Sequence, residues 1–195
     1  MQLKIIQNNY VLVPSFISKE QANFLAEEFQ KHCKKFNTKN VLDPSPHINS
    51  VLNWLPFIKL LVQKIPEVSK IVGEDVLPSY TYSRWQTKGH NLPRHRDRPA
   101  CEISLSINLK KDKDWSFWIQ KPSNEEVEIN LNPGDAILYL GCQADHWRHE
   151  FCGNEHVQVF LHYVRANGPK AWAFFDKQQQ QEPTLHKDSL PITIL

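Results

Sequence analysis

The sequence predicts an α+β domain that is mainly β, with a helical N-terminal part followed by a strand-rich part. Three observations predict this class. Helical apolar spacing is confined to the residues before about 75, apolar and polar residues alternate from Pro78 onward, and 195 residues can bury a core without disulfides. We expect one domain over 1–195, with a helical buttress at about 15–75, a β core at about 78–166 and a polar tail at about 177–195.

The helical part follows a short strand predicted at 10–13. Ser18 and Gln21 have the spacing of a capping box, which marks the start of a helix. The apolar side chains that follow recur on one helical face: Leu25, Phe29, Cys33 and Phe36. Three further segments are predicted, namely a loop at 37–50, a second helix at about 53–65 that Pro66 ends, and a short helix that Gly73 closes.

The second half of the chain has strand character in six segments: 79–87, 101–110, 115–120, 125–131, 135–140 and 156–165. In the second and the last of these, apolar residues such as Leu105 alternate with polar residues such as Ser106. Both strands therefore have one apolar and one mostly polar face. A barrel-like sandwich with a polar pocket inside and helices on its outer apolar face would explain this, and an ordinary sandwich with its polar side in water is the alternative.

Composition narrows the classes of function. The chain has 23 basic and 21 acidic residues, a balance that does not indicate a nucleic-acid groove. Arg94, Arg96 and Arg98 form a local cluster, which is either a solvated face or a site that attracts an anionic substrate. The four cysteines lack zinc-like spacing, and no segment is apolar enough for a signal peptide or membrane span. We therefore expect a cytoplasmic protein with reduced thiols and no membrane contact.

The most informative motif is His95-Arg96-Asp97. On an extended chain, residues two apart point to the same side, roughly 6.5 Å from each other, so His95 and Asp97 can bind one metal ion. His146, from a distant segment, would complete a set of two imidazoles and one carboxylate, although His149 is a rival for this place. Such a set leaves coordination positions open for substrate and oxygen and is typical of non-haem Fe(II) oxygenases.

The residues around this motif extend the pattern. Trp85, Gly89 and Leu92 precede the His-x-Asp pair at fixed spacing, and Pro133-Gly134-Asp135 forms a turn before the distal histidine. Over about 78–165 the chain resembles the 2-oxoglutarate and Fe(II)-dependent oxygenases of the prolyl hydroxylase type. The resemblance implies a double-stranded β-helix, a cupin-like jelly roll, with the N-terminal helices packed on one sheet.

The resemblance also implies an activity and its cofactors. His95, Asp97 and His146 would bind Fe(II) and form the catalytic centre, and 2-oxoglutarate would be the cosubstrate. Reaction with O2 would hydroxylate a C–H bond of a prolyl or other peptide side chain, or of a small molecule, with succinate and CO2 as co-products. Two other classes stay open: a cupin-like metal-binding protein without 2-oxoglutarate turnover, and a nucleic-acid oxygenase, which only the arginine cluster supports.

The expected cosubstrate residues are Asn108, His156 and Gln158. In the family, a basic residue nine or ten positions after the distal histidine binds the distal carboxylate of 2-oxoglutarate. Counting from His146 leads to His156, whereas counting from His149 leads to Gln158, which favours His146. The family expects arginine or lysine at this place, and a guanidinium binds a carboxylate far better than a neutral imidazole does.

The missing charge at this position has several possible sources. His156 could be protonated by its anionic partner, or Arg84 or Arg165 could supply the charge. Trp85 stands where a tyrosine often helps to hold the cosubstrate. For Arg148, beside the distal ligand, contact with substrate and a structural ion pair are both open.

Overall fold

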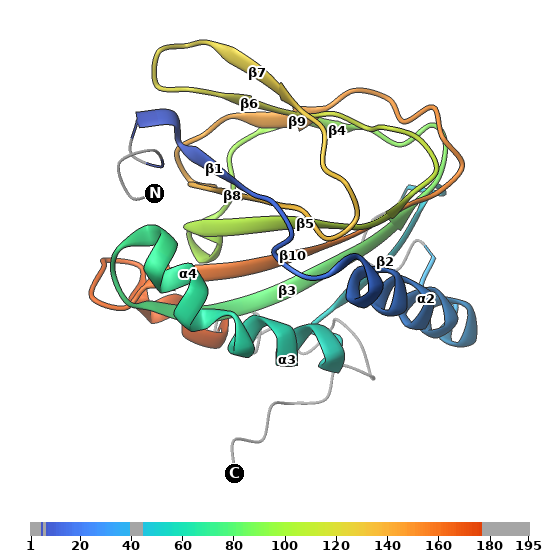
Figure 1. The fold of residues 1–195 in the computed structure, drawn as a ribbon, viewed down its shortest axis with the longest axis horizontal. Coiled ribbons are helices and arrows are strands. Elements are labelled where there is room, and N and C mark those ends of the chain that lie inside the picture. Colours follow the sequence, from blue (N-terminus) through green and yellow to red (C-terminus); the bar gives the residue numbers. More distant parts are fainter. Residues whose placement is uncertain (1–4, 6, 40–44, 177–195) are drawn as a thin grey trace.

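The computed structural model describes residues 5, 7–39 and 45–176 (Figure 1). Its strands are β1 (Tyr10–Val13), β2 (Ile48–Leu52), β3 (Val76–Gln86), β4 (Leu92–His95), β5 (Ile103–Lys111), β6 (Phe117–Gln120), β7 (Glu126–Ile129), β8 (Ala136–Tyr139), β9 (His146–Arg148) and β10 (His156–Arg165). Its helices are α2 (Lys19–Phe36), α3 (Leu55–Gln63) and α4 (Ile65–Val72), with 3-10 segments η1 (Pro99–Cys101) and η2 (Ala171–Asp176). The predicted tail at 177–195 lies outside the described residues.

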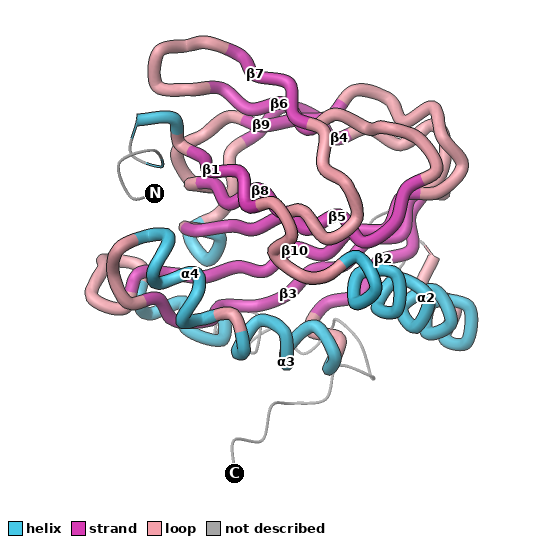
Figure 2. The backbone as a smooth tube through the Cα atoms, viewed as in Figure 1, coloured by secondary structure: helices cyan, strands magenta, loops and turns pink. Residues whose placement is uncertain are grey.

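The strands form two antiparallel sheets. One has six strands in the order β1-β8-β5-β10-β3-β2, and the other has four in the order β4-β9-β6-β7. In Figure 1 the smaller sheet lies above the larger one, and α2, α3 and α4 lie on the opposite side of the larger sheet. Figure 2 shows how strands dominate the chain after α4. The predicted mainly-β class with helices on one sheet is confirmed.

Ser18, the first residue of the predicted capping box, is the N-cap of α2. The Ser18 hydroxyl accepts a hydrogen bond from the Gln21 backbone N–H at 3.1 Å, and the helix ends at Asn37 in the left-handed conformation. The buried face of α2 joins α3, α4 and the outer face of the larger sheet in one hydrophobic core, in which Phe29 and Phe57 are fully buried. Burying side chains of this size contributes about 1.5–3 kcal/mol each.

The prediction for the segment after α2 was partly wrong. The helix predicted at about 53–65 is present as α3, and the predicted short helix is α4, which Gly73 ends, but Pro66 does not end the first of the two. Pro66 lies in the first turn of α4, where the missing N–H costs nothing, and α3 and α4 adjoin at Lys64. The predicted loop at 37–50 contains the start of β2, which pairs with β3, while residues 40–44 of that loop lie outside the described residues.

The polar faces of β5 and β10 point into the molecule. Ser104, Ser106, Asn108, Gln158 and His162 are all buried, so the alternative of a sandwich with its polar side in water is wrong. The apolar faces of the same strands pack against the helices. The space between the sheets is therefore lined by hydrogen-bonding groups. Among the described residues, no helix is both long and apolar enough to cross a membrane.

Candidate metal centre

Two histidines and an aspartate meet where β4 pairs with β9. His95 and His146 are cross-strand partners, so their ring centroids lie 4.3 Å apart. Asp97 is fixed by a hydrogen bond from its backbone N–H to the carbonyl of Gly141 at 2.9 Å. Its Oδ1 atom lies 3.5 Å from His95 Nε2 and 3.6 Å from His146 Nε2. The three side chains therefore converge, with one ligand atom from each lying within 4.8 Å of the others.

Backbone carbonyls fix the orientation of both imidazoles. His95 Nδ1 lies 2.8 Å from the carbonyl oxygen of Pro93, and His146 Nδ1 lies 3.0 Å from that of Ala144. A carbonyl oxygen only accepts hydrogen bonds, so the Nδ1 atom carries the proton and the Nε2 atom keeps its lone pair. Histidine ligands of metals are usually held in this way. Both Nε2 atoms are thus prepared to bind a metal ion.

The other carboxylate oxygen of Asp97, Oδ2, accepts a hydrogen bond on the side away from the histidines. Ser104 Oγ donates a hydrogen bond to Asp97 Oδ2 at 3.0 Å and lies 2.9 Å from Nδ1 of the buried His162. Gly141 packs closely here, since a Cβ atom on it would lie 2.3 Å from Asp97 Oδ2. The carboxylate is therefore oriented with Oδ1 toward the two histidines.

The electrostatics keep the carboxylate charged. Burial alone would raise the pKa of Asp97, but its contacts with His146 and His95 outweigh burial and hold that pKa well below the ordinary value. The Asp97 carboxylate, whose Oδ1 atom lies 3.5 Å from His95 Nε2, is the largest cause that raises the pKa of His95. Burial lowers the pKa of His162 to about 4, so this ring is neutral near pH 7.

The donor set fits a divalent transition metal ion. Two imidazoles and one carboxylate on one side leave the remaining coordination positions open, as in non-haem Fe(II) oxygenases. His146 is buried beside Asp97, whereas the rival His149 is exposed and its ring lies 5.7 Å from that of Trp118. The structure thus brings His95, Asp97 and His146 together and leaves His149 outside the group.

The three residues expected at the cosubstrate lie on the inner face of the larger sheet. Asn108 and Gln158 are cross-strand partners on β5 and β10, and His156 is two residues along β10. His156 Nδ1 lies 3.4 Å from Gln86 Oε1 on β3. The Gln158 Nε2 and Gln86 Nε2 donors are buried without a hydrogen-bond partner among the described residues.

The surroundings of His156 disfavour a positive charge on its ring. Its ring packs against Trp115 at 5.1 Å and Phe151 at 5.8 Å. Burial, with a smaller contribution from the charge of Arg148, lowers the pKa of His156 well below the ordinary value. Arg165 does not reach this region, because it pairs with Glu74 and Glu102 at the other end of β10.

Arg148, for which the sequence left substrate contact and a structural ion pair open, forms no ion pair among the described residues. It lies two residues after His146 on β9, and only 4% of its surface is exposed. Its guanidinium donates hydrogen bonds to the Trp115 carbonyl and, at 3.2 Å, to Gln158 Oε1. Burial lowers the pKa of Arg148 to about 9. The available signal was its spacing from His146, which places both side chains on one face of an extended strand.

The arginines that alternate with the metal-binding residues are paired with carboxylates. Arg94 contacts Glu126 at 2.5 Å and Asp145 at 3.5 Å, and Arg96 contacts Asp145 at 2.5 Å. Arg98 pairs with the buried Asp176. The cluster is therefore neutralised by its own surroundings, which removes the support for a nucleic-acid oxygenase.

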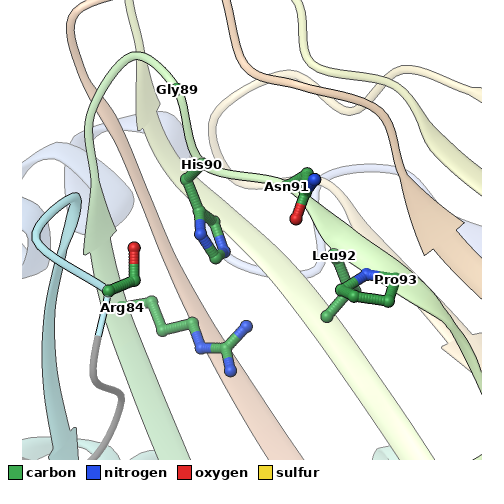
Figure 3. A pocket seen from close by; sticks show the side chains of 7 residues that line it. Arg84, Gly89, His90, Asn91, Leu92 and Pro93 are labelled. Atoms are coloured by element: carbon green, nitrogen blue, oxygen red, sulfur yellow. The ribbon is translucent and has the colours of Figure 1, made fainter.

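A pocket of about 330 Å³ opens beside β4 (Figure 3). It is lined by Ser45, Arg84, Gly89, His90, Asn91, Leu92 and Pro93. Arg84 and His90 are the charged and titratable side chains seen in Figure 3. Trp85, the next residue on β3, instead packs against the helix-side core and under Lys34, so it does not take the place of a cosubstrate-binding tyrosine.

Comparison with known proteins supports this description of the fold. No protein-family sequence model matches the chain, and no curated protein is similar to it in sequence. Among solved structures, a prolyl-4-hydroxylase from Pseudomonas putida is similar at 13% identity, with a TM-score of 0.65 over 83% of this chain and 95% of that one. The nogalamycin-biosynthesis epimerase SnoN is similar at 13% identity, with a TM-score of 0.70 over 97% of this chain and 91% of that one.

A third similar structure contains ligands. HygX from Streptomyces hygroscopicus, with nickel and 2-oxoglutarate bound, has 13% identity and a TM-score of 0.64 over 85% of this chain and 87% of that one. The chain thus has the fold of the 2-oxoglutarate/Fe(II) oxygenases, as its motifs predicted.

Proposed function

We propose that this protein is an Fe(II)- and 2-oxoglutarate-dependent dioxygenase that hydroxylates a C–H bond. The observation that carries the proposal is the convergence of His95 Nε2, His146 Nε2 and Asp97 Oδ1 between the two sheets, with both imidazoles already oriented by backbone carbonyls. The fold shared with P. putida prolyl-4-hydroxylase and HygX supports the same reaction class.

The protein residues would position the reactants. His95, Asp97 and His146 would hold Fe(II), which with O2 and 2-oxoglutarate supplies the oxidative chemistry and yields succinate and CO2. Ser104 would keep Asp97 from rotating, because it binds the oxygen that faces away from the histidines. The polar residues on the inner face of the larger sheet, such as Asn108, lie outside the metal-binding group and would hold the cosubstrate.

The pocket beside β4 would admit the substrate. Its volume of about 330 Å³ lies at the small end of ligand pockets, which run from about 300 to 1,000 Å³. A space of this size suits one amino-acid side chain, such as proline, or a small polar molecule. Pro93 lines this pocket and also holds His95, so a substrate there would lie next to the metal-binding group.

Succinate formation from 2-oxoglutarate tests the proposal. Protein supplied with Fe(II) and O2 should release succinate, and Asp97→Ala should abolish this release while its circular dichroism spectrum is unchanged. Asp112→Ala is the control, because Asp112 binds backbone N–H groups of Asn154 and Glu155 and has no part in the metal-binding group. Metal binding without succinate release or 2-oxoglutarate binding would identify a cupin-like metal protein instead, and succinate release by Asp97→Ala would contradict the ligand assignment.

A further inference from the structure

A buried guanidinium lies close to the metal-binding group without a carboxylate partner. Arg94, Arg96, Arg98 and Arg165 each form an ion pair with an acidic side chain. Arg148 is buried and forms no ion pair among the described residues. A buried charge is normally paired, because removing it from water costs several kcal/mol. The exception at Arg148 indicates a place for an anion that arrives from outside the chain.

The surroundings of Arg148 hold it in one geometry. Its guanidinium lies 4.8 Å from the Trp115 ring and 5.3 Å from the Phe117 ring. Two of its donors are used by the Trp115 carbonyl and by Gln158 Oε1, which also lies 3.5 Å from Ser106 Oγ. A guanidinium fixed by stacking and by neutral acceptors is suited to bind a carboxylate, since little side-chain entropy is lost on binding.

Unused hydrogen-bond donors lie around the same place. Arg148 Nε and Gln158 Nε2 are buried and have no hydrogen-bond partner in the described structure, and Gln86 Nε2 is in the same state next to His156. Buried polar atoms in native proteins are nearly always satisfied. Arg148 Nε, Gln158 Nε2 and Gln86 Nε2 are donors, so the partner that they lack is an acceptor, which agrees with a carboxylate; the neighbouring Asn108 Oδ1, also buried without a partner, needs a donor instead.

Arg148 and His146 lie on one face of β9, because residues two apart on a strand point to the same side. A dicarboxylate held at the metal-binding group by its keto-acid end would therefore have its second carboxylate on the side of the strand where Arg148 lies. We propose that Arg148, rather than His156, binds the distal carboxylate of 2-oxoglutarate in this protein. This inference rests on the proposed function.

The binding partner of the distal carboxylate would thus come from β9, the strand that carries His146, and not from β10. His156 sits where the resemblance expects a basic residue, but its buried ring packs on Trp115, where burial disfavours a positive charge. Gln158, on β10, would keep a supporting role by orienting Arg148. The positive charge that binds the distal carboxylate would thus come from the smaller sheet, which contains β9, and not from the larger sheet, which contains β10.

The test compares two keto acids that differ only at the distal end. Full-chain protein loaded with Ni(II), which does not turn over, is titrated calorimetrically with 2-oxoglutarate and with 2-oxopentanoate, which lacks the distal carboxylate. The unmodified protein should prefer 2-oxoglutarate by about 100-fold, which corresponds to about 2.7 kcal/mol. In Arg148→Met the preference should fall below about threefold, while affinity for 2-oxopentanoate changes by less than about threefold.

Further variants keep the test decisive. Arg148→Lys keeps the positive charge but cannot form the two parallel hydrogen bonds of a guanidinium, so it should retain a preference of about tenfold. This variant replaces Arg148→Met in the test if Arg148→Met does not fold. Arg84→Met and His156→Phe address the rival anchors. A preference that survives in Arg148→Met, or that collapses in either rival variant instead, would overturn the inference. If unmodified protein binds both acids equally, this inference fails alone, and if it binds neither, the proposed function fails with it.

Discussion

Replacing Gly141 with alanine should weaken the metal site although Gly141 supplies no ligand. The new Cβ atom would lie 2.3 Å from Asp97 Oδ2 and 2.4 Å from the Cys101 carbonyl oxygen, well inside van der Waals contact. Either the carboxylate or the backbone of η1 must move. Overpacking of this kind costs about 1–3 kcal/mol of stability. Because the carboxylate is the more mobile group, we expect Oδ1 to turn away from the two histidines.

Loss of an outer contact to a metal ligand typically reduces metal affinity by about 10–100-fold, and we expect this range for Gly141→Ala. Affinity is measured by titrating metal-free protein with Co(II) or Ni(II). Gly153→Ala is a matched control, since its Cβ would lie 2.4 Å from Asp112 Oδ1 and 2.5 Å from Phe151 Cζ, outside the metal-binding group. Both variants should lose similar stability, but only Gly141→Ala should lose metal affinity. Equal metal affinities in the two variants would refute the reasoning.

Three further predictions concern single side chains. His146→Ala should reduce metal affinity and succinate release by at least about 100-fold while His149→Ala leaves both within about threefold; equal effects would reverse the assignment. The folded pKa of His162 is about 4, below its unfolded value of about 6.5, so this residue alone should reduce the stability of metal-free protein by about 2 kcal/mol between pH 7.5 and 5.0, because at this site only the unfolded chain binds the proton; the buried His156 acts in the same direction. His162→Gln should lose less over the same interval in urea denaturation, and an undiminished loss would contradict this cause. Ser18→Ala removes the cap on the Gln21 N–H and should lower the free energy of unfolding by about 1 kcal/mol, measured in the same assay; no change would mean that water replaces the cap.

Features with strong local causes could be predicted from the sequence. The capping box located the start of α2, and the two-residue alternation in β5 and β10 located both strands. The alternation left open which face met water, because periodicity does not show what covers a polar face. The structure decides this by burying Ser106 and Gln158 between the sheets.

Short strands around the metal-binding group were missed for a physical reason. β9 has three residues, all buried, and therefore shows no alternation. β4 contains Pro93, which ordinarily argues against a strand, but β4 is an edge strand of the smaller sheet, where proline is tolerated. The carbonyls that orient the two histidines and the neutralisation of the arginine cluster depend on long-range contacts. No local pattern encodes them.

The pairing of Arg98 with Asp176 has a consequence for the C-terminal part of the protein. Asp176 ends η2, is 2% exposed, and binds the residue next to Asp97 through two hydrogen bonds. The η2 segment therefore fixes the loop that contains Asp97 and Arg98. Shortening the chain to a point before 176 would free this loop, so a minimal active fragment must extend beyond the last strand, even though no residue after β10 belongs to the group of His95, Asp97 and His146.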